Sequence, residues 1–283
     1  FAYHALRQQN ITSDSFVFNT AVGYSAGDGV TTGTLNTLIG GLAGDALTTG
    51  DSNVALGYNA LSADTKGARS VAIGRDALIS QNFTTATNAV NVAVGDRSGD
   101  AVTTGIENTL IGGSSGSGLQ DADFNVAVGA SALTADTLGS RSVAIGTSAL
   151  QTQNFTTATD TYNTAVGFQA GKAVTTGILN TLVGGLAGDA ITTGVRNTVL
   201  GALALSEETT GEYSTAVGYQ ALTVQNSTTG ASMYNTAVGY QAGFSVTTGQ
   251  SNTLIGGLAG DALTTGDNNS VLGKSALSAA TKS

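Results

Sequence analysis

A five-residue word, Asn/Ser-x-apolar-apolar-Gly, recurs along the whole chain at a fixed spacing. Successive closing glycines are 17, 17, 17 and 21 residues apart, and this order repeats as a 72-residue superrepeat. The closing glycines are Gly23, Gly40, Gly57, Gly74, Gly95, Gly112, Gly129, Gly146, Gly167, Gly184, Gly201, Gly218, Gly239, Gly256 and Gly273. Such regularity is typical of a repeat architecture, in which each unit forms one structural module.

Each unit combines a short run of β-branched and small residues with Gly-rich turn signals such as Thr-Thr-Gly. Apolar residues at helical spacing are absent, and the chain contains no proline. Because one such unit cannot bury a face alone, equivalent strands must stack on one another. The sequence therefore predicts an all-β parallel β-solenoid with coils of 17 or 21 residues, each rising about 4.8 Å.

The superrepeat divides the chain into a partial long coil at 1–18 and four superrepeats, the last of them incomplete. The four superrepeats are 19–90, 91–162, 163–234 and 235–283. Both ends interrupt a coil. We therefore expect a single repetitive domain that is a segment of a longer fibre.

Two columns of equivalent residues have expected structural roles. The closing glycines should form coil corners that need a positive φ or a close backbone approach, and the first six are Gly23, Gly40, Gly57, Gly74, Gly95 and Gly112. Asparagine side chains should stack as a ladder along the coils, with Ser70, Ser142 and Ser214 at every fourth position. The first ladder residues are Asn19, Asn36, Asn53, Asn91 and Asn108.

Both faces of each strand are apolar, although a thin coil can cover only its inside. We expect the column of Val22, Ile39 and Leu56 to fill the interior, because its residues are large. The opposite column, with Ala21 and Leu38, should then pack against another copy of the chain. The alternative is that the connecting arms fold over it.

Composition excludes several classes of function. The net charge of −9 opposes binding to nucleic acid or to anionic lipid. The chain has no cysteine and no apolar run long enough to span a membrane, and its N-terminal FAYHALRQQN lacks the layout of a signal peptide.

The words NTAVG, NVAVG, SVAIG and NTLIG, each followed by x-x-Ala in most units, resemble the head repeat of trimeric autotransporter adhesins, most closely SVAIG at Ser70 and Ser142. NTAVGFQAG at Asn163 and NTAVGYQAG at Asn235 are also similar to long repeats of phage tail-fibre proteins. The resemblance covers nearly the whole chain. It implies a left-handed β-roll, a homotrimer and contact with a cell surface. The longer coils here should enlarge an outer loop and leave the strand intact.

The long coils carry aromatic residues among Asn, Gln and Thr, a composition that suits sugar rings. The candidate contacts for a glycan are Phe83, Phe155, Tyr162 and Tyr234. The alternative is that these rings pack between chains and fix the loops.

No cofactor or metal site is expected. The loop GGLAGDALTTG lacks the phosphate-binding ending, and Gly273-Lys274-Ser275 has it but Asn268 replaces the required first glycine. Asp45, Asp100, Asp189 and Asp261 lack the spacing of calcium-binding repeats. The carboxylates near Asp121 and Glu208 depart from the repeat, but they lie five coils apart, too far for a glycosidase pair. We therefore expect no enzyme.

These observations favour the extracellular shaft of a phage-type tail fibre that mediates attachment to the host surface. The head of a trimeric bacterial adhesin is the alternative. Ice binding through a threonine column and polysaccharide cleavage are weaker alternatives of another class.

Overall fold

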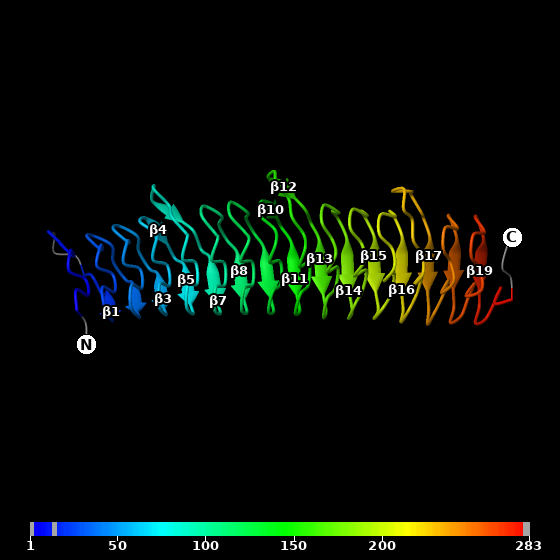
Figure 1. Ribbon diagram of the computed structural model, residues 1–283, viewed down its shortest axis with the longest axis horizontal. Coiled ribbons are helices and arrows are strands. Elements are labelled where there is room, and N and C mark those ends of the chain that lie inside the picture. Colours follow the sequence, from blue (N-terminus) through cyan, green and yellow to red (C-terminus); the bar gives the residue numbers. More distant parts are fainter. Residues whose placement is uncertain (1–2, 13–15, 280–283) are drawn as a thin grey trace. The chain divides into compact units, whose positions relative to one another are not determined.

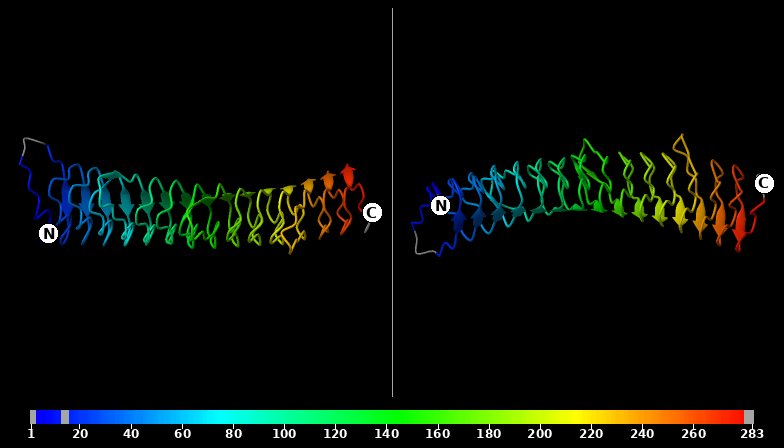
Figure 2. Two further views of the ribbon diagram at one scale, coloured as in Figure 1. Left: turned by 90° about the horizontal axis from the view of Figure 1, so that it is seen from above. Right: turned by 60° about the horizontal axis from the view of Figure 1, so that its bottom comes forward.

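The chain forms a parallel β-solenoid, and its described residues contain no helix (Figure 1). The computed structural model describes residues 3–12 and 16–279. Two compact units divide the chain: Phe1–Arg141 with Thr156–Thr159, and Ser142–Phe155 with Asp160–Ser283. Within each unit, the strands lie along one side of the stacked coils and the loops along the other (Figure 2).

Every coil contributes one three-residue strand to a parallel sheet. In the first unit the strands are β1 (Thr20–Val22), β2 (Thr37–Ile39), β3 (Val54–Leu56), β5 (Val71–Ile73), β7 (Val92–Val94), β8 (Thr109–Ile111) and β9 (Val126–Val128). In the second they are β11 (Val143–Ile145), β13 (Thr164–Val166), β14 (Thr181–Val183), β15 (Thr198–Leu200), β16 (Thr215–Val217), β17 (Thr236–Val238), β18 (Thr253–Ile255) and β19 (Ser270–Leu272).

Strand register follows the sequence repeat. Thr20 pairs with Thr37, 17 residues later, whereas Val71 pairs with Val92 across a 21-residue coil. The predicted parallel β-solenoid is confirmed, and the longer coil leaves the strand ladder intact.

The extra residues of the long coils form additional short pairings on the loop side. β6 (Thr87–Asn88) pairs in parallel with β4 (Gly67–Ala68) of the preceding coil, and in the second unit an isolated bridge joins Glu212 and Ser232. The other two-residue strands are β10 (Gly139–Ser140) and β12 (Thr159–Asp160). These coils stand above their neighbours near the β4 and β12 labels in Figure 1.

The strand faces are the reverse of those expected from sequence. Leu38 and Ala55, at the middle of their strands, are fully buried inside the coil, whereas Val22 is 48% and Leu56 42% exposed. The prediction was wrong because it gave the interior to the column with the larger side chains. The interior is filled mainly by alanine and leucine, together with valines such as Val30 and Val199.

Large and small residues compensate one another inside neighbouring coils. A Cβ added to Gly27 or Gly44 would lie 2.6 or 2.8 Å from a methyl group of Leu38, so these glycines make room for that leucine. In the next coil Ala55 takes the strand position and Leu61 takes the position of Gly44. The four-coil superrepeat therefore encodes the complementary packing of the core.

Each coil closes through several residues in the left-handed region of φ. In the coil at 53–69, Asn59, Leu61 and Arg69 have φ values of 56°, 55° and 63°. Their backbone N–H groups donate to the carbonyl oxygens of Gly41, Ala77 and Asp51 in neighbouring coils, at 3.0–3.1 Å. This conformation is unfavourable for bulky residues, and the stacking of the coils holds it in place.

The closing glycines also have positive φ, from 130° to 144° at the six corners named above. A Cβ on Gly57 would lie 2.3 Å from the carbonyl oxygen of Gly74, the corner of the next coil. Only glycine fits these corners, because both the conformation and the space exclude a side chain.

The asparagine column bonds mainly to the backbone. Asn36 Nδ2 donates to Gly50 O at 2.9 Å, and Asn36 Oδ1 accepts from the backbone N–H of Asn53, also at 2.9 Å. Direct bonds between side-chain amides are longer, as from Asn108 Nδ2 to Asn91 Oδ1 at 3.3 Å. The ladder thus ties the turn of each coil to the strand of the next.

Where serine interrupts this column, a glutamine from the long coil bridges the gap. Gln81 Nε2 donates to Asp64 Oδ2 at 2.6 Å and to Ser70 Oγ at 3.1 Å, and Gln81 Oε1 accepts from Asn91 Nδ2 at 2.9 Å. All of these side chains are fully buried. In the second unit Gln225 makes the equivalent bonds to Glu208, Ser214 and Asn235.

Candidate interaction surface

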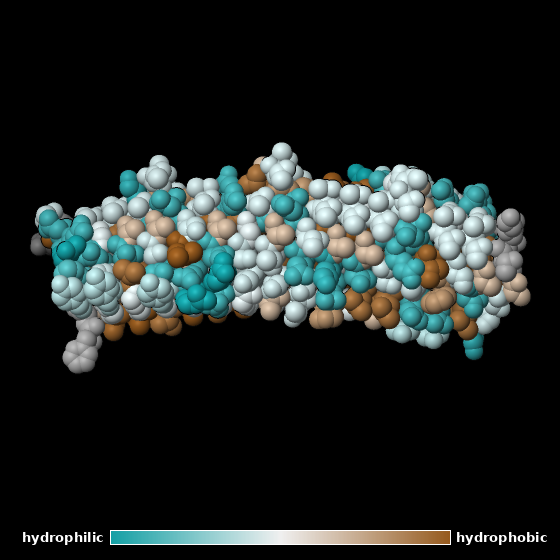
Figure 3. All heavy atoms as spheres, in the orientation of Figure 1, coloured by the Kyte–Doolittle hydropathy of each residue, from teal (hydrophilic) through white to brown (hydrophobic). Residues whose placement is uncertain are grey.

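The outward face of the sheet exposes an apolar column in each unit. It is formed by the third residue of every strand, always Val, Ile or Leu. Its most exposed members are Val22, Leu56 and Ile111 in the first unit and Ile145, Leu200, Ile255 and Leu272 in the second. Figure 3 shows apolar side chains gathered along the lower margin, beneath the strands of the first unit.

No arm of the described chain covers this face. The opposite column, with Leu38 and Ala55, was expected to pack against another copy, but it is fully buried within the chain itself, so for that column the alternative of self-coverage holds. Contiguous exposed apolar surface of this kind is uncommon on soluble proteins and marks interaction sites. The face is therefore the strongest candidate for contact with a partner.

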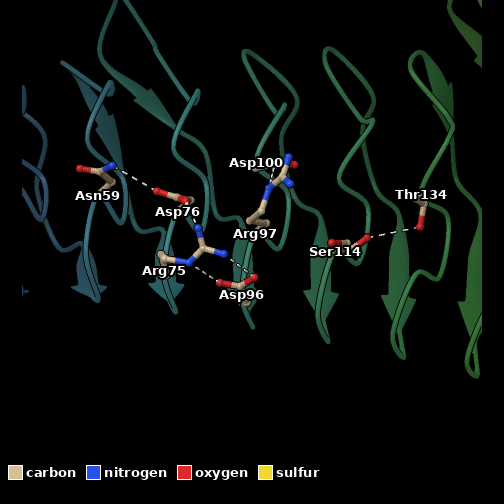
Figure 4. Close-up of polar contacts among 8 residues, drawn as sticks. All are labelled: Asn59, Arg75, Asp76, Asp96, Arg97, Asp100, Ser114 and Thr134. Carbon is tan, nitrogen blue, oxygen red and sulfur yellow. Dashed lines mark hydrogen bonds and ion pairs between the residues drawn. The ribbon is translucent and has the colours of Figure 1, made fainter.

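Beside this face lies a cluster of opposite charges in the first unit (Figure 4). Arg75 lies 2.8 Å from Asp96 Oδ1 and 3.0 Å from Asp76 Oδ2, and Arg97 lies 2.9 Å from Asp100 Oδ2. The hydrogen bond and charge of Asp96 raise the pKa of Arg75. Asn59 Nδ2 donates to Asp76 Oδ1 at 3.1 Å.

An open hollow of about 420 Å³ lies among these residues, with Ile79 on its wall. Figure 4 also shows a contact in the following coils, where Thr134 Oγ1 donates to the carbonyl oxygen of Ser114.

The positions equivalent to Arg75, Asp76, Asp96 and Arg97 hold uncharged residues in the second unit. Tyr219 and Tyr240 correspond to Arg75 and to Asp96, and their rings stack at 5.8 Å. Gln241 Nε2 donates to Gln220 Oε1 at 2.7 Å. This surface therefore diverges between superrepeats whose strands and corners are nearly identical.

The candidate glycan contacts separate into two groups. Phe83 and Phe155 are only 6% and 7% exposed, which corrects the expectation that they lie on the surface. Their coils fold these rings inward. Tyr162 and Tyr234 are exposed, and Tyr234 stacks on Tyr213 at 5.1 Å.

The carboxylates that break the repeat have structural partners. Glu208 is fully buried, and its Oε1 accepts from the backbone N–H of Gly211 at 2.7 Å and of Ser227 at 2.9 Å. Asp121 accepts from Thr104 Oγ1, and Asp123 accepts from the backbone N–H of Ile106.

Aspartates of the Gly-Asp turns are partly desolvated. One carboxylate oxygen of each of Asp45, Asp189 and Asp261 is buried without a hydrogen-bond partner. Burial raises the pKa of Asp45 and of Asp189, and the charge of Asp28 adds to the rise at Asp45. Among the described residues, no three His, Cys, Asp or Glu side chains gather in a way that suits a metal ion.

Sequence reasoning missed the charge cluster because its residues look like ordinary surface substitutions. The signal was present in the superrepeat alignment, where Asp96 replaces an aromatic residue and Arg75 replaces Thr147 or Tyr219.

The fold defines a repeat-built parallel β-solenoid with an uncovered apolar face. No family model and no curated protein matches the chain. Over residues 3–12 and 16–279, the chain has no helix with the length and hydropathy needed to cross a bilayer.

Proposed function

We propose that the chain is a structural segment of an extracellular homotrimeric fibre, of the kind found in phage tail fibres, that carries attachment to a host surface. The observation that carries this proposal is the apolar column on the outward face of the sheet. Leu56 is 42% exposed and Leu200 is 50% exposed. Contact of these apolar side chains with water is unfavourable, and burial against sister chains would remove this free-energy cost. The number of three chains comes from the resemblance of the repeats.

Analytical ultracentrifugation of the full chain tests the assembly. We expect a species of three times the monomer mass. The double variant Leu56→Asp/Leu200→Asp should sediment as a monomer, because two charges per chain would be buried at the interface. Thr49→Asp, on an exposed loop, is the matched control and should remain trimeric. A monomeric wild-type chain would refute the proposal.

The head of a trimeric bacterial adhesin remains the second proposal, in which the same apolar column would join the three chains. The complete gene separates the two, since an adhesin carries a signal peptide and a C-terminal membrane anchor, whereas a fibre carries a virion-anchoring domain. A thermal-hysteresis assay tests ice binding.

Contact with a surface glycan is supported only by Tyr162 and Tyr234, whose rings are exposed beside polar loops. A glycan array with wild type and Tyr234→Ala tests this role. Binding that the variant loses supports it, and an array without hits leaves the chain as a spacer.

A further inference from the structure

Repetition creates an alignment problem for any assembly of this chain. The outward column offers Val22, Ile39 and Leu56 in successive coils, so a neighbouring copy could shift by one coil and still meet residues of the same type. A shift of one superrepeat would preserve nearly the whole pattern. Apolar packing alone therefore cannot fix how far one chain is displaced along another.

The charge cluster, unlike the apolar column, can distinguish one axial displacement from another. The position directly after the closing glycine forms the first column, in which Arg75 is followed one coil later by Asp96. In the next residue the order is reversed, with Asp76 followed by Arg97. The four charges thus alternate both along each column and between the columns (Figure 4).

Three of these four side chains are exposed, whereas Asp76 is only 18% exposed. Arg75, Asp96 and Arg97 are each more than half exposed. Exposed ion pairs contribute little to the stability of a single chain. When a second surface covers the same charges and excludes water, matched opposite charges are favoured strongly over like charges, so the charges select one alignment of the two surfaces.

The cluster also occurs once in the described chain. The corresponding four positions hold Thr147, Ser148, Phe168 and Gln169 in one superrepeat and Tyr219, Gln220, Tyr240 and Gln241 in the next. A displacement by one superrepeat would place the charges against uncharged side chains.

We propose that Arg75, Asp76, Asp96 and Arg97 set the axial alignment between copies of this chain. The inference rests on the proposed homo-oligomer. In a cyclic assembly each interface joins different surfaces of two copies. In the proposed arrangement the first charged column faces the second column of its neighbour. When equivalent coils of the two copies lie side by side, Arg75 faces Asp76 and Asp96 faces Arg97 of the neighbour, so that opposite charges meet. After a shift by one coil, like charges meet.

Cross-linking mass spectrometry of the full chain tests this proposal, and the absence of cysteine makes site-specific labelling simple. Ala130, an exposed residue, is changed to Cys and coupled to a benzophenone. Chains of natural isotope content are assembled with chains enriched in ¹⁵N, so that links between copies are recognised by mass. With the wild-type cluster we expect links to the coil at 125–141 of the other copy.

The variant Arg75→Asp/Asp96→Arg reverses the first column only. In this variant the copies should be displaced by one coil, so that the cross-links should appear in peptides 17 residues before or after the original ones. Adding Asp76→Arg, Arg97→Asp and Asp100→Lys reverses the second column as well and should restore the original links. Lys172 occupies the position equivalent to Asp100, so the fold accommodates a lysine there.

The swap Arg7→Asp/Asp28→Arg exchanges another exposed ion pair of the first unit and serves as the control, with links unchanged. An oligomer whose links stay the same after reversal of the first column would overturn this proposal and leave the homo-oligomer standing. The absence of any link between copies, together with a monomer in the ultracentrifuge, would overturn both.

Discussion

At the scale of single residues, the corner glycines carry the strictest requirement. Gly57 has a φ of 144°, and a Cβ there would lie 2.3 Å from Gly74 O. We expect Gly57→Ala to lower the free energy of unfolding by about 3 kcal/mol through backbone strain and displacement of the next coil. Gly113→Ala is the matched control, because nothing lies within 4 Å of an added Cβ. Guanidinium unfolding should show a change below about 0.5 kcal/mol for this control.

A second residue-scale prediction concerns pH. Burial raises the pKa of Asp45 above its ordinary value of 3.8, so the folded state disfavours the ionised carboxylate. The resulting loss of stability is absent below the unfolded pKa and grows as pH rises through the folded pKa. Asp45→Asn should therefore raise the thermal midpoint at pH 7 and leave it unchanged near pH 3. An equal gain at both pH values would show that charge is not the cause.

Sequence alone predicted much at this scale, but unevenly. The glycines were placed at corners because a glycine closes the five-residue word in every coil. The left-handed positions at Leu61 and Arg69 were not foreseen, since bulky residues seldom adopt this conformation and give no local signal for it. Only stacking between coils, a long-range property, selects it.

At the scale of the element, the long coil supplies the polar junction of each superrepeat. Gln81 joins Asp64, Ser70 and Asn91 in a fully buried network. Gln81→Met keeps the length of the side chain and removes its hydrogen bonds. We expect a loss of about 3 kcal/mol in guanidinium unfolding, because buried polar groups are left without partners. Gln120→Met, at an exposed glutamine, should change the midpoint little.

The existence of the strands and their register followed from the repeat, whereas the identity of their inner face did not. Alternation along NTAVG distinguishes two faces, but Ala21 and Val22 are both apolar. The choice depends on the width of the coil, which is set by Leu38 packing over Gly27 and Gly44. The pairing of β4 with β6 was also missed, because Thr87 and Asn88 give a weak strand signal.

At the scale of the whole molecule, each coil bonds only to its neighbours, so a complete coil is a removable module. Deletion of 109–125 joins Asn108 to Val126 and keeps both the asparagine column and the strand register. We expect this variant to fold with an unchanged β-type circular dichroism spectrum. Deletion of 109–116, which removes about half a coil, should abolish that spectrum. Equal tolerance of both deletions would contradict a solenoid.

The in-register stacking has a consequence for the gene. Each coil corresponds to a whole number of codons, and equivalent coils of different superrepeats are nearly the same in sequence. Misaligned copying of such DNA therefore adds or removes complete coils and leaves the reading frame and the ladder undisturbed. A population of related genes should accordingly differ in steps of one superrepeat, with length evolving faster than the shape of any coil.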